Sequence, residues 1–225
     1  MKGTMKRVIV AIDGPAGAGK STIARRIAER LGYLYLDTGA MYRAVALWAL
    51  RAGVALDDMH RLDQLAAESA IRLEGARVFL NGEDVTTAIR EPHVSEAASR
   101  VSAVPAVRRA MVDKQREMAA GASVVMEGRD IGTVVFPEAD VKVFLDADAA
   151  VRAQRRHLEL GGEDQDVLRE MAARDRRDRG RAEAPLVQAP DAVYIDSTGL
   201  SLDQVEEAVL KLIRDRISNG KEVAR

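Results

Sequence analysis

The sequence contains no cysteine, only three histidines and 4% aromatic residues, and its formal net charge is −1. Without cysteine the chain cannot form disulfides or thiolate zinc sites, and histidines this far apart in sequence argue against a metal cluster. The balanced charge and the scarcity of aromatic residues argue against a general nucleic-acid-binding protein. No apolar run approaches the roughly 20 residues that a membrane-spanning helix needs, so we expect no membrane partner.

The remaining composition is that of an ordinary globular chain. Hydrophobic residues make up 47% of the 225 residues and charged residues 31%, and this length suits one large α/β domain. The chain does not open with a basic segment followed by an apolar one. We therefore expect no leader peptide and a cytoplasmic location. We also expect a monomer that acts on small molecules.

The stretch from Val8 to Ser21 is the most informative motif in the chain. Apolar residues up to Ile12 predict a buried strand, and the residues from Gly14 to Ser21 then match G-x-x-x-x-G-K-S. The glycines let the backbone bend so that successive N–H groups face a phosphate, and the following helix adds its unpaired N–H groups. The pattern predicts a nucleoside-triphosphate site made of Gly14, Pro15, Ala16, Gly17, Ala18, Gly19, Lys20, Ser21 and Thr22.

Two side chains of this loop have separate expected roles. Lys20 supplies a point charge for the outer phosphates, and the hydroxyl of Ser21 can ligate Mg²⁺. An accidental glycine-rich turn is the alternative interpretation. The helical spacing of Ile23, Ile27 and Leu31 after the loop favours the nucleotide site, because a strand before and a helix after are the context that the motif needs.

Short apolar segments alternate with helical patterns along most of the chain, which predicts a doubly wound, five-stranded parallel α/β sheet. The predicted strands cover residues 8–12, 33–36, 123–126, 141–145 and 193–195. Around Asn81-Gly82, a strong hairpin signal, β-like pieces interrupt this alternation and indicate an inserted subdomain. The expected parts of this single domain are a core at about 5–62, 93–150 and 182–217, an insert at about 63–92 that extends into helices up to residue 120, and an arginine-rich helical pair at about 151–181.

Arginines are concentrated between residues 169 and 181, together with several acidic residues. On a helix, Arg174, Asp178 and Arg181 are spaced i, i+4 and i+7 and share one face. In isolation, a solvated and salt-bridged surface helix would explain such a run. Beside a phosphate-binding loop we favour arginines that close over phosphates, with Arg155 and Arg156 from the preceding helix, because phosphoryl transfer needs charge stabilisation and exclusion of water.

Other polar residues follow predicted strands directly. Arg129 and Asp130 come after one strand. Asp37 ends another, and Thr38 and Arg43 lie in the helix that follows it. Ligands bind at the carboxyl ends of strands in open α/β sheets, so this location favours function over an ordinary surface ion pair. For Arg43, sequence spacing alone does not separate a phosphate contact from a surface charge.

Together these segments resemble bacterial cytidylate kinases, a branch of the P-loop nucleoside monophosphate kinases, from about Arg7 to Ile217. The first segment below is typical of any P-loop NTPase, whereas the second and third together are specific to this branch. The matching segments are Ile-Asp-Gly-Pro-Ala-Gly-Ala-Gly-Lys-Ser (12–21), Leu-Asp-Thr-Gly-Ala-Met-Tyr-Arg (36–43), Glu-Gly-Arg-Asp-Ile-Gly-Thr-Val-Val-Phe-Pro (127–137), Val-Phe-Leu-Asp-Ala (143–147), Arg-Asp-Arg-Arg-Asp-Arg (174–179) and Ala-Pro-Leu (184–186).

The resemblance implies that ATP and CMP or dCMP react with Mg²⁺ to give ADP and CDP or dCDP, between a core, a monophosphate-binding insert and an arginine-rich lid. It implies a CMP site of Thr38, Tyr42, Arg43, Ser99, Arg108, Arg129, Asp130, Arg174, Asp178 and Arg181. In this set the acceptor phosphate would be held by Thr38, Arg43 and Arg129, the cytosine by Ser99, Arg108 and Asp130, and the ribose by Arg174 and Asp178. The expected catalytic residues are Lys20, Arg129, Arg155 and Arg181, and the lid arginine that meets the transferring phosphoryl stays open.

Asp130 also has a physical reason to distinguish bases, since a carboxylate accepts a hydrogen bond from the cytosine amine but meets only a carbonyl oxygen in uracil. A general base is the alternative role, although positioning and charge matter more in phosphoryl transfer.

Three other functions stay open at this point. They are a P-loop kinase for another monophosphate or for a small metabolite such as shikimate, a nucleotide-switched binding protein, and a nucleic-acid-binding protein that uses the arginines. The chain has no Asn-Lys-x-Asp guanine-reading motif, which argues against the second, and its balanced charge argues against the third.

Overall fold

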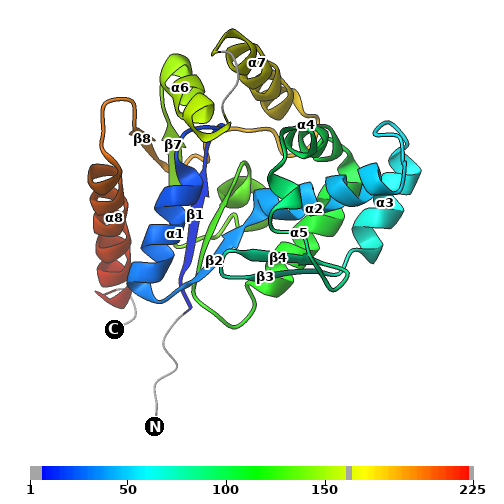
Figure 1. Ribbon diagram of the computed structural model, residues 1–225. Coiled ribbons are helices and arrows are strands. Elements are labelled where there is room, and N and C mark those ends of the chain that lie inside the picture. Colours follow the sequence, from blue (N-terminus) through cyan, green and yellow to red (C-terminus); the bar gives the residue numbers. More distant parts are fainter. Residues whose placement is uncertain (1–6, 161–163, 223–225) are drawn as a thin grey trace.

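A five-stranded parallel sheet forms the centre of the protein, as the sequence predicts (Figure 1). The computed structural model describes residues 7–160 and 164–222. In spatial order the strands are β2 (Leu34–Asp37), β6 (Val124–Gly128), β1 (Ile9–Asp13), β7 (Val141–Asp146) and β8 (Val193–Asp196). All neighbouring pairs are parallel, and the register places Asp13 opposite Gly128 and Asp37 opposite Glu127. The carboxyl ends of these strands therefore meet at one edge of the sheet.

Helices cover both faces of this sheet. The covering elements are α1 (Lys20–Leu31) and α8 (Leu202–Glu222) on one face, and α5 (Pro105–Met118) and the short turn η2 (Ile131–Val135) on the other. Along β1, Val10 and Ile12 pack toward α1 and α8, whereas Ile9 and Ala11 pack toward α5 and η2. Successive side chains of a strand point to opposite faces, so a strand covered on both faces must be apolar throughout. Ligands can reach β1 only at its ends.

A second apolar cluster lies to one side of the sheet (Figure 1). Its elements, besides parts of α5, are α2 (Thr38–Arg51), α3 (Met59–Glu68), β3 (Ile71–Glu74), β4 (Arg77–Leu80), η1 (Ala88–Arg90) and α4 (Pro92–Val101). The short, exposed strand β5 (Glu83–Asp84) pairs with β4 at the edge of this region. Met41, Leu62 and Val94 are fully buried in the cluster. Asn81 and Gly82, which join β4 to β5, have φ angles of 51° and 88°. Positive φ at both positions is the geometry of a tight hairpin turn, so the predicted antiparallel hairpin is confirmed.

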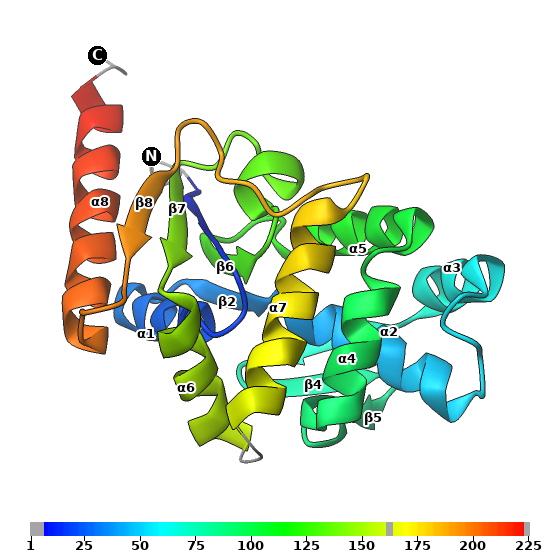
Figure 2. The ribbon, with the colours of Figure 1, turned by 90° about the horizontal axis from the view of Figure 1, so that it is seen from above.

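Two helices lie over the carboxyl edge of the sheet. They are α6 (Ala149–Leu160) and α7 (Asp164–Gly180). Seen from above, α7 runs between α6 and α4 (Figure 2). Ala153 of α6 and Met171 of α7 pack with Ala16 of the loop after β1. The two helices thus contact both this loop and the side cluster. Within the described residues, no helix is long and apolar enough to cross a membrane.

The loop after β1 contains two glycines that allow a matched test of backbone strain. Gly14 has a φ of 147°, and a Cβ atom there would lie 1.9 Å from the carbonyl oxygen of Leu145. Gly19 has a φ of 91°, but a Cβ atom there would meet nothing within 4 Å. Gly19→Ala should therefore cost only backbone strain, about 1 kcal/mol, whereas Gly14→Ala adds a steric clash and should cost about 3 kcal/mol. Denaturant unfolding of the ligand-free proteins measures both, and equal losses would contradict the clash.

Candidate active site

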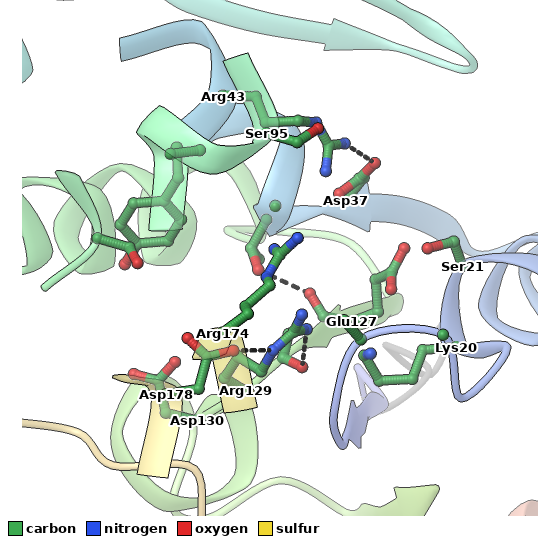
Figure 3. A pocket seen from close by; sticks show the side chains of 18 of the residues that line it. Lys20, Ser21, Asp37, Arg43, Ser95, Glu127, Arg129, Asp130, Arg174 and Asp178 are labelled. Atoms are coloured by element: carbon green, nitrogen blue, oxygen red, sulfur yellow. Dashed lines mark hydrogen bonds and ion pairs between the residues drawn. The ribbon is translucent and has the colours of Figure 1, made fainter. Parts of the chain in front are cut away.

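A cavity of about 540 Å³ opens at the carboxyl edge of the sheet, between the loop after β1, α2, α4, the loop after β6 and α7 (Figure 3). Its walls come from segments that are far apart in the chain. The residues of the predicted nucleotide and CMP sites that line it are Ala16, Gly17, Gly19, Lys20, Ser21, Thr22, Thr38, Tyr42, Arg43, Arg108, Arg129, Asp130, Arg174, Asp178 and Arg181. The fold therefore brings most of the predicted site residues together.

One end of the cavity is formed by the loop between β1 and α1. No side chain caps the first turn of α1, so its backbone N–H groups are available to an anion. Lys20 is buried, and its Nζ donates a hydrogen bond to the carbonyl oxygen of Pro15 at 2.7 Å. Burial, together with the positive charge of Arg129, lowers the pKa of Lys20 to about 7. The negative charge of an incoming phosphate would stabilise the protonated form of Lys20 and so offset the effects of burial and of Arg129.

Glu127 lies beside Lys20 and Ser21 in the same part of the cavity (Figure 3). It is 4% exposed, and it accepts a hydrogen bond from Tyr35 Oη at 2.7 Å. Burial raises the pKa of Glu127 and Asp37 adds to this effect, while Lys20 and hydrogen bonds from Ser21 and Tyr35 oppose it. The Ser21 hydroxyl and this carboxylate are hard oxygen donors of the kind that Mg²⁺ prefers.

The opposite end of the cavity contains a buried ion pair between Arg108 and Asp130. Arg108 also donates a hydrogen bond to the carbonyl oxygen of Ser102 at 3.1 Å, and its guanidinium lies 5.5 Å from the centre of the Tyr42 ring. The pair presents donors and a carboxylate acceptor next to an aromatic face. Such a set can pair with the polar edge of a planar base.

Arginines crowd the space between these two ends. Arg129 Nε donates to Asp178 Oδ2 at 2.9 Å, and Arg43 pairs with Asp37 at 2.9 Å (Figure 3). Burial lowers the pKa of Arg174 to about 9, with further lowering by Arg129 and with Asp178 opposing it. Burial and the neighbouring charge of Arg129 both disfavour the charged guanidinium, and a bound anion would offset them. The middle of the cavity is suited to a polyanion.

Two predicted site residues do not line the cavity through their side chains. Arg155 turns toward β8 and donates hydrogen bonds to the hydroxyl and the carbonyl oxygen of Ser197 at 3.0 and 2.8 Å. Ser99 is buried, and its hydroxyl accepts a hydrogen bond from Arg177 Nε at 3.0 Å. Neighbouring positions on a helix point about 100° apart, and Arg156 lines the cavity instead. Gly14, Pro15 and Ala18 of the loop are also absent from the lining, since they face the protein.

The structure also adds residues that the sequence did not single out for the site. Glu127 is the last side chain of β6 before the glycine turn, so its place at the carboxyl edge could have suggested a role. The other added residues carry no signal in the sequence beyond their charge or polarity, and they are Arg25, Arg90, Ser95 and Ser102. Asp37 and Arg156, which the sequence places at the sheet edge and next to Arg155, line the cavity as well.

The low pKa of Lys20 predicts a stability effect with a defined sign. The folded protein releases this proton at about pH 7, whereas the unfolded chain keeps it up to its ordinary value of 10.5. Below pH 7 the buried charge therefore destabilises the fold, and this penalty disappears as the pH rises from 7 to 10.5. Lys20→Met should raise the thermal midpoint of the ligand-free protein at pH 6, with a smaller gain at pH 9.

Lys142 supplies the matched control for this prediction. It is also buried, but its Nζ pairs with Asp191 at 2.8 Å. Lys142→Met should change the midpoint by a smaller and similar amount at both pH values, because Asp191 and Pro137, the two acceptors of its Nζ, are exposed to water. If Lys20→Met lowers the thermal midpoint at pH 6, the buried charge of Lys20 does not destabilise the ligand-free protein.

Comparisons with known proteins agree with the geometry. The cytidylate kinase family model matches residues 10–215. The chain is 60% identical over 224 residues to the cytidylate kinase of Solibacter usitatus (strain Ellin6076), covering 96% of this chain and 97% of that protein. It is 52% identical over 220 residues to the cytidylate kinase of Syntrophotalea carbinolica (strain DSM 2380 / NBRC 103641 / GraBd1), covering 94% of both.

A solved structure shows the same fold at low sequence identity. It is a gluconokinase from Sinorhizobium meliloti 1021, with a TM-score of 0.50 and 16% identity over 96% of this chain and 99% of that chain. This likeness concerns the arrangement of the sheet and helices alone. The family model and the relatives match nearly the whole length, which confirms the resemblance seen in the sequence: the chain belongs to the cytidylate kinase family.

Proposed function

We propose that this protein transfers the γ-phosphoryl group of ATP to CMP or dCMP and so forms ADP and CDP or dCDP. The observation that carries the proposal is the buried Arg108–Asp130 pair, which lies in the same cavity as the phosphate-binding loop. One end can hold a triphosphate and the other can pair with a base, with arginines between them. Family membership supports the same reaction.

At the ATP end, the backbone from Gly14 to Thr22 would surround the phosphates while Lys20 neutralises the outer ones. Arg129, Arg174 and Arg156 are the arginines of the cavity that would stabilise charge on the transferring group. The lid would be residues 151–181, in which the described helices α6 and α7 lie over this edge and would exclude water. The core at about 5–62, 93–150 and 182–217 would hold ATP, and the insert at about 63–92, with helices up to 120, would close the acceptor side.

At the acceptor end, Thr38, Arg43 and Arg129 would bind the phosphate of CMP. The ribose would be contacted by Arg174 and Asp178, and Arg181 would reach toward the phosphate. Tyr42 would border the base. Asp130 would accept a hydrogen bond from the cytosine amine, and Arg108 would donate to the ring acceptors. Ser99 would act through Arg177, which its hydroxyl contacts, rather than by touching the base.

Mg²⁺ fits this site through few protein ligands. Ser21 and Glu127 supply oxygen donors, and no group of three or more metal-ligating side chains occurs in residues 7–160 and 164–222. Mg²⁺ commonly keeps waters and binds substrate phosphates, where it neutralises charge, so a sparse protein set is sufficient. We further propose that the protein works as a monomer in the cytoplasm, since one chain builds the whole cavity and both substrates are dissolved nucleotides.

The direct test is ADP formation with CMP, dCMP, UMP, AMP, GMP and no acceptor. We expect CMP and dCMP to give the highest kcat/KM. A preference for a purine monophosphate, or hydrolysis that ignores every acceptor, would contradict the proposal.

Asp130→Asn tests base recognition while it preserves the size of the buried side chain next to Arg108. The replacing amide can donate to uracil O4 as well as accept from the cytosine amine, so the preference for CMP over UMP should narrow by roughly tenfold to a few hundredfold. The measurement is kcat/KM for each nucleotide at saturating ATP. A fall by the same factor for both would assign Asp130 to a general role instead.

Arg156 and Arg155 form a matched pair for the lid, because they are adjacent on α6 but only Arg156 lines the cavity. Arg156→Ala should lower kcat by roughly a hundredfold or more, as for loss of a preorganised charge at a transferring phosphoryl. Arg155→Ala should instead lower the thermal midpoint, since two hydrogen bonds to Ser197 are lost, and leave kcat within about tenfold. The reverse ranking in kcat would return the catalytic role to Arg155.

A further inference from the structure

Asp13 is a buried carboxylate to which the proposed mechanism gives no part. It is the last residue of β1 and directly precedes Gly14 of the phosphate-binding loop. It is 5% exposed and does not line the cavity. Its two oxygens accept hydrogen bonds from consecutive backbone N–H groups, Oδ1 from Ile131 at 2.8 Å and Oδ2 from Gly132 at 2.7 Å.

Ile131 and Gly132 lie at the end of the short segment that carries the proposed acceptor-binding residues Arg129 and Asp130. Gly128 pairs with Asp13 in the register of β6 against β1, and Ile131 and Gly132 return to the side chain of the same aspartate. The chain between these attachments consists of Arg129 and Asp130. One residue therefore holds both ends of the segment from which these two side chains reach the cavity.

The geometry of this contact favours a carboxylate. Each N–H donor meets its own oxygen, and an ionised carboxylate offers both, whereas an amide would place its N–H₂ group against one of the two donors. Keeping the charge in the interior is costly: burial raises the pKa of Asp13 to about 6, Asp130 adds to this, and the two amides and Lys20 oppose it. A buried charge contributes little net stability, so its value lies in the geometry that it enforces.

We propose that Asp13 is a positioning residue for acceptor recognition: its carboxylate fixes the backbone from Gly128 to Gly132 and thereby aims Arg129 and Asp130 relative to the phosphate loop. The proposal rests on the proposed function for the identity of the acceptor. β1 would then support both substrate sites: Asp13 holds the acceptor-binding segment, and the next residue begins the ATP-binding loop. Displacement of either side chain by about 1 Å is enough to cost a large factor in rate.

Asp13→Asn is the test variant, and Asp140→Asn is its matched control. Asp140 Oδ2 accepts the backbone N–H of Ile9 at 2.9 Å, at the opposite end of the same strand and away from the cavity. Asp13→Asn should lower kcat/KM for CMP by about tenfold to a hundredfold and narrow the CMP-to-UMP ratio, with a much smaller change in KM for ATP. Asp140→Asn should leave all three quantities near those of the unaltered protein.

Amide hydrogen exchange gives a readout that does not depend on turnover. In Asp13→Asn the amides of Ile131 and Gly132 should lose protection while those of β1 keep it. If Asp13→Asn does not fold, Gly132→Ala disturbs the same contact more gently. A Cβ atom there would lie 3.4 Å from Asp13 Oδ2 and 3.1 Å from Lys142 Cδ. It should shift the CMP-to-UMP ratio in the same direction by a smaller factor.

An unchanged CMP-to-UMP ratio in both variants, or equal losses toward ATP and CMP, would overturn the positioning role and mark Asp13 as a general support of the fold. The two hypotheses fail in different ways. If the unaltered protein phosphorylates no pyrimidine monophosphate, the proposed function is wrong. If it does so and Asp13→Asn keeps the ratio, only the inference about Asp13 is wrong.

Discussion

Lys20, Arg129 and Arg174 share a desolvated cavity in which burial and mutual repulsion lower the pKa of Lys20 to about 7 and that of Arg174 to about 9. Such an arrangement is unfavourable in the empty protein and becomes favourable when phosphates supply negative charge. The rest of the site can be understood from this constraint. Enough anionic groups must surround the cations to keep the fold intact, but not so many that they neutralise the charge that the phosphates need.

The carboxylates satisfy this requirement by their placement. Asp178 forms an ion pair with Arg129, and Asp37 forms one with Arg43. Asp130 pairs with Arg108 at the far end of the cavity. Each pair orients a guanidinium as well as offsetting its charge, because the N–H groups of arginine have a fixed fork geometry. Asp13 extends the same principle to the backbone, where it orders two amides instead of a cation. The same contacts thus offset charge and fix geometry. The two requirements conflict at Lys20, whose buried charge would favour a bound phosphate but destabilises the ligand-free protein.

The sheet makes these contacts possible because it gathers the ends of β1, β2 and β6 at one edge. The helices α6 and α7 then approach that edge from outside and contact both the phosphate-binding loop and α4. Residues from the loop after β1, α2, α5, the loop after β6 and α7 meet in one cavity although long stretches of chain separate them. A cavity assembled in this way depends on the whole fold.

The sequence by itself determined the glycine-rich loop between β1 and α1, the parallel sheet and the hairpin at Asn81-Gly82, because each of these depends on local spacing and on glycine or apolar periodicity. The tertiary structure decided which of the adjacent Arg155 and Arg156 lines the cavity, since the rotation of α6 depends on its packing and not on its composition. It also decided that Ser99 contacts Arg177 and that Asp13 binds the amide of Ile131, 118 residues away in the chain. Contacts at that separation leave no periodic mark in a single sequence, because they form only when the finished fold brings the two segments together.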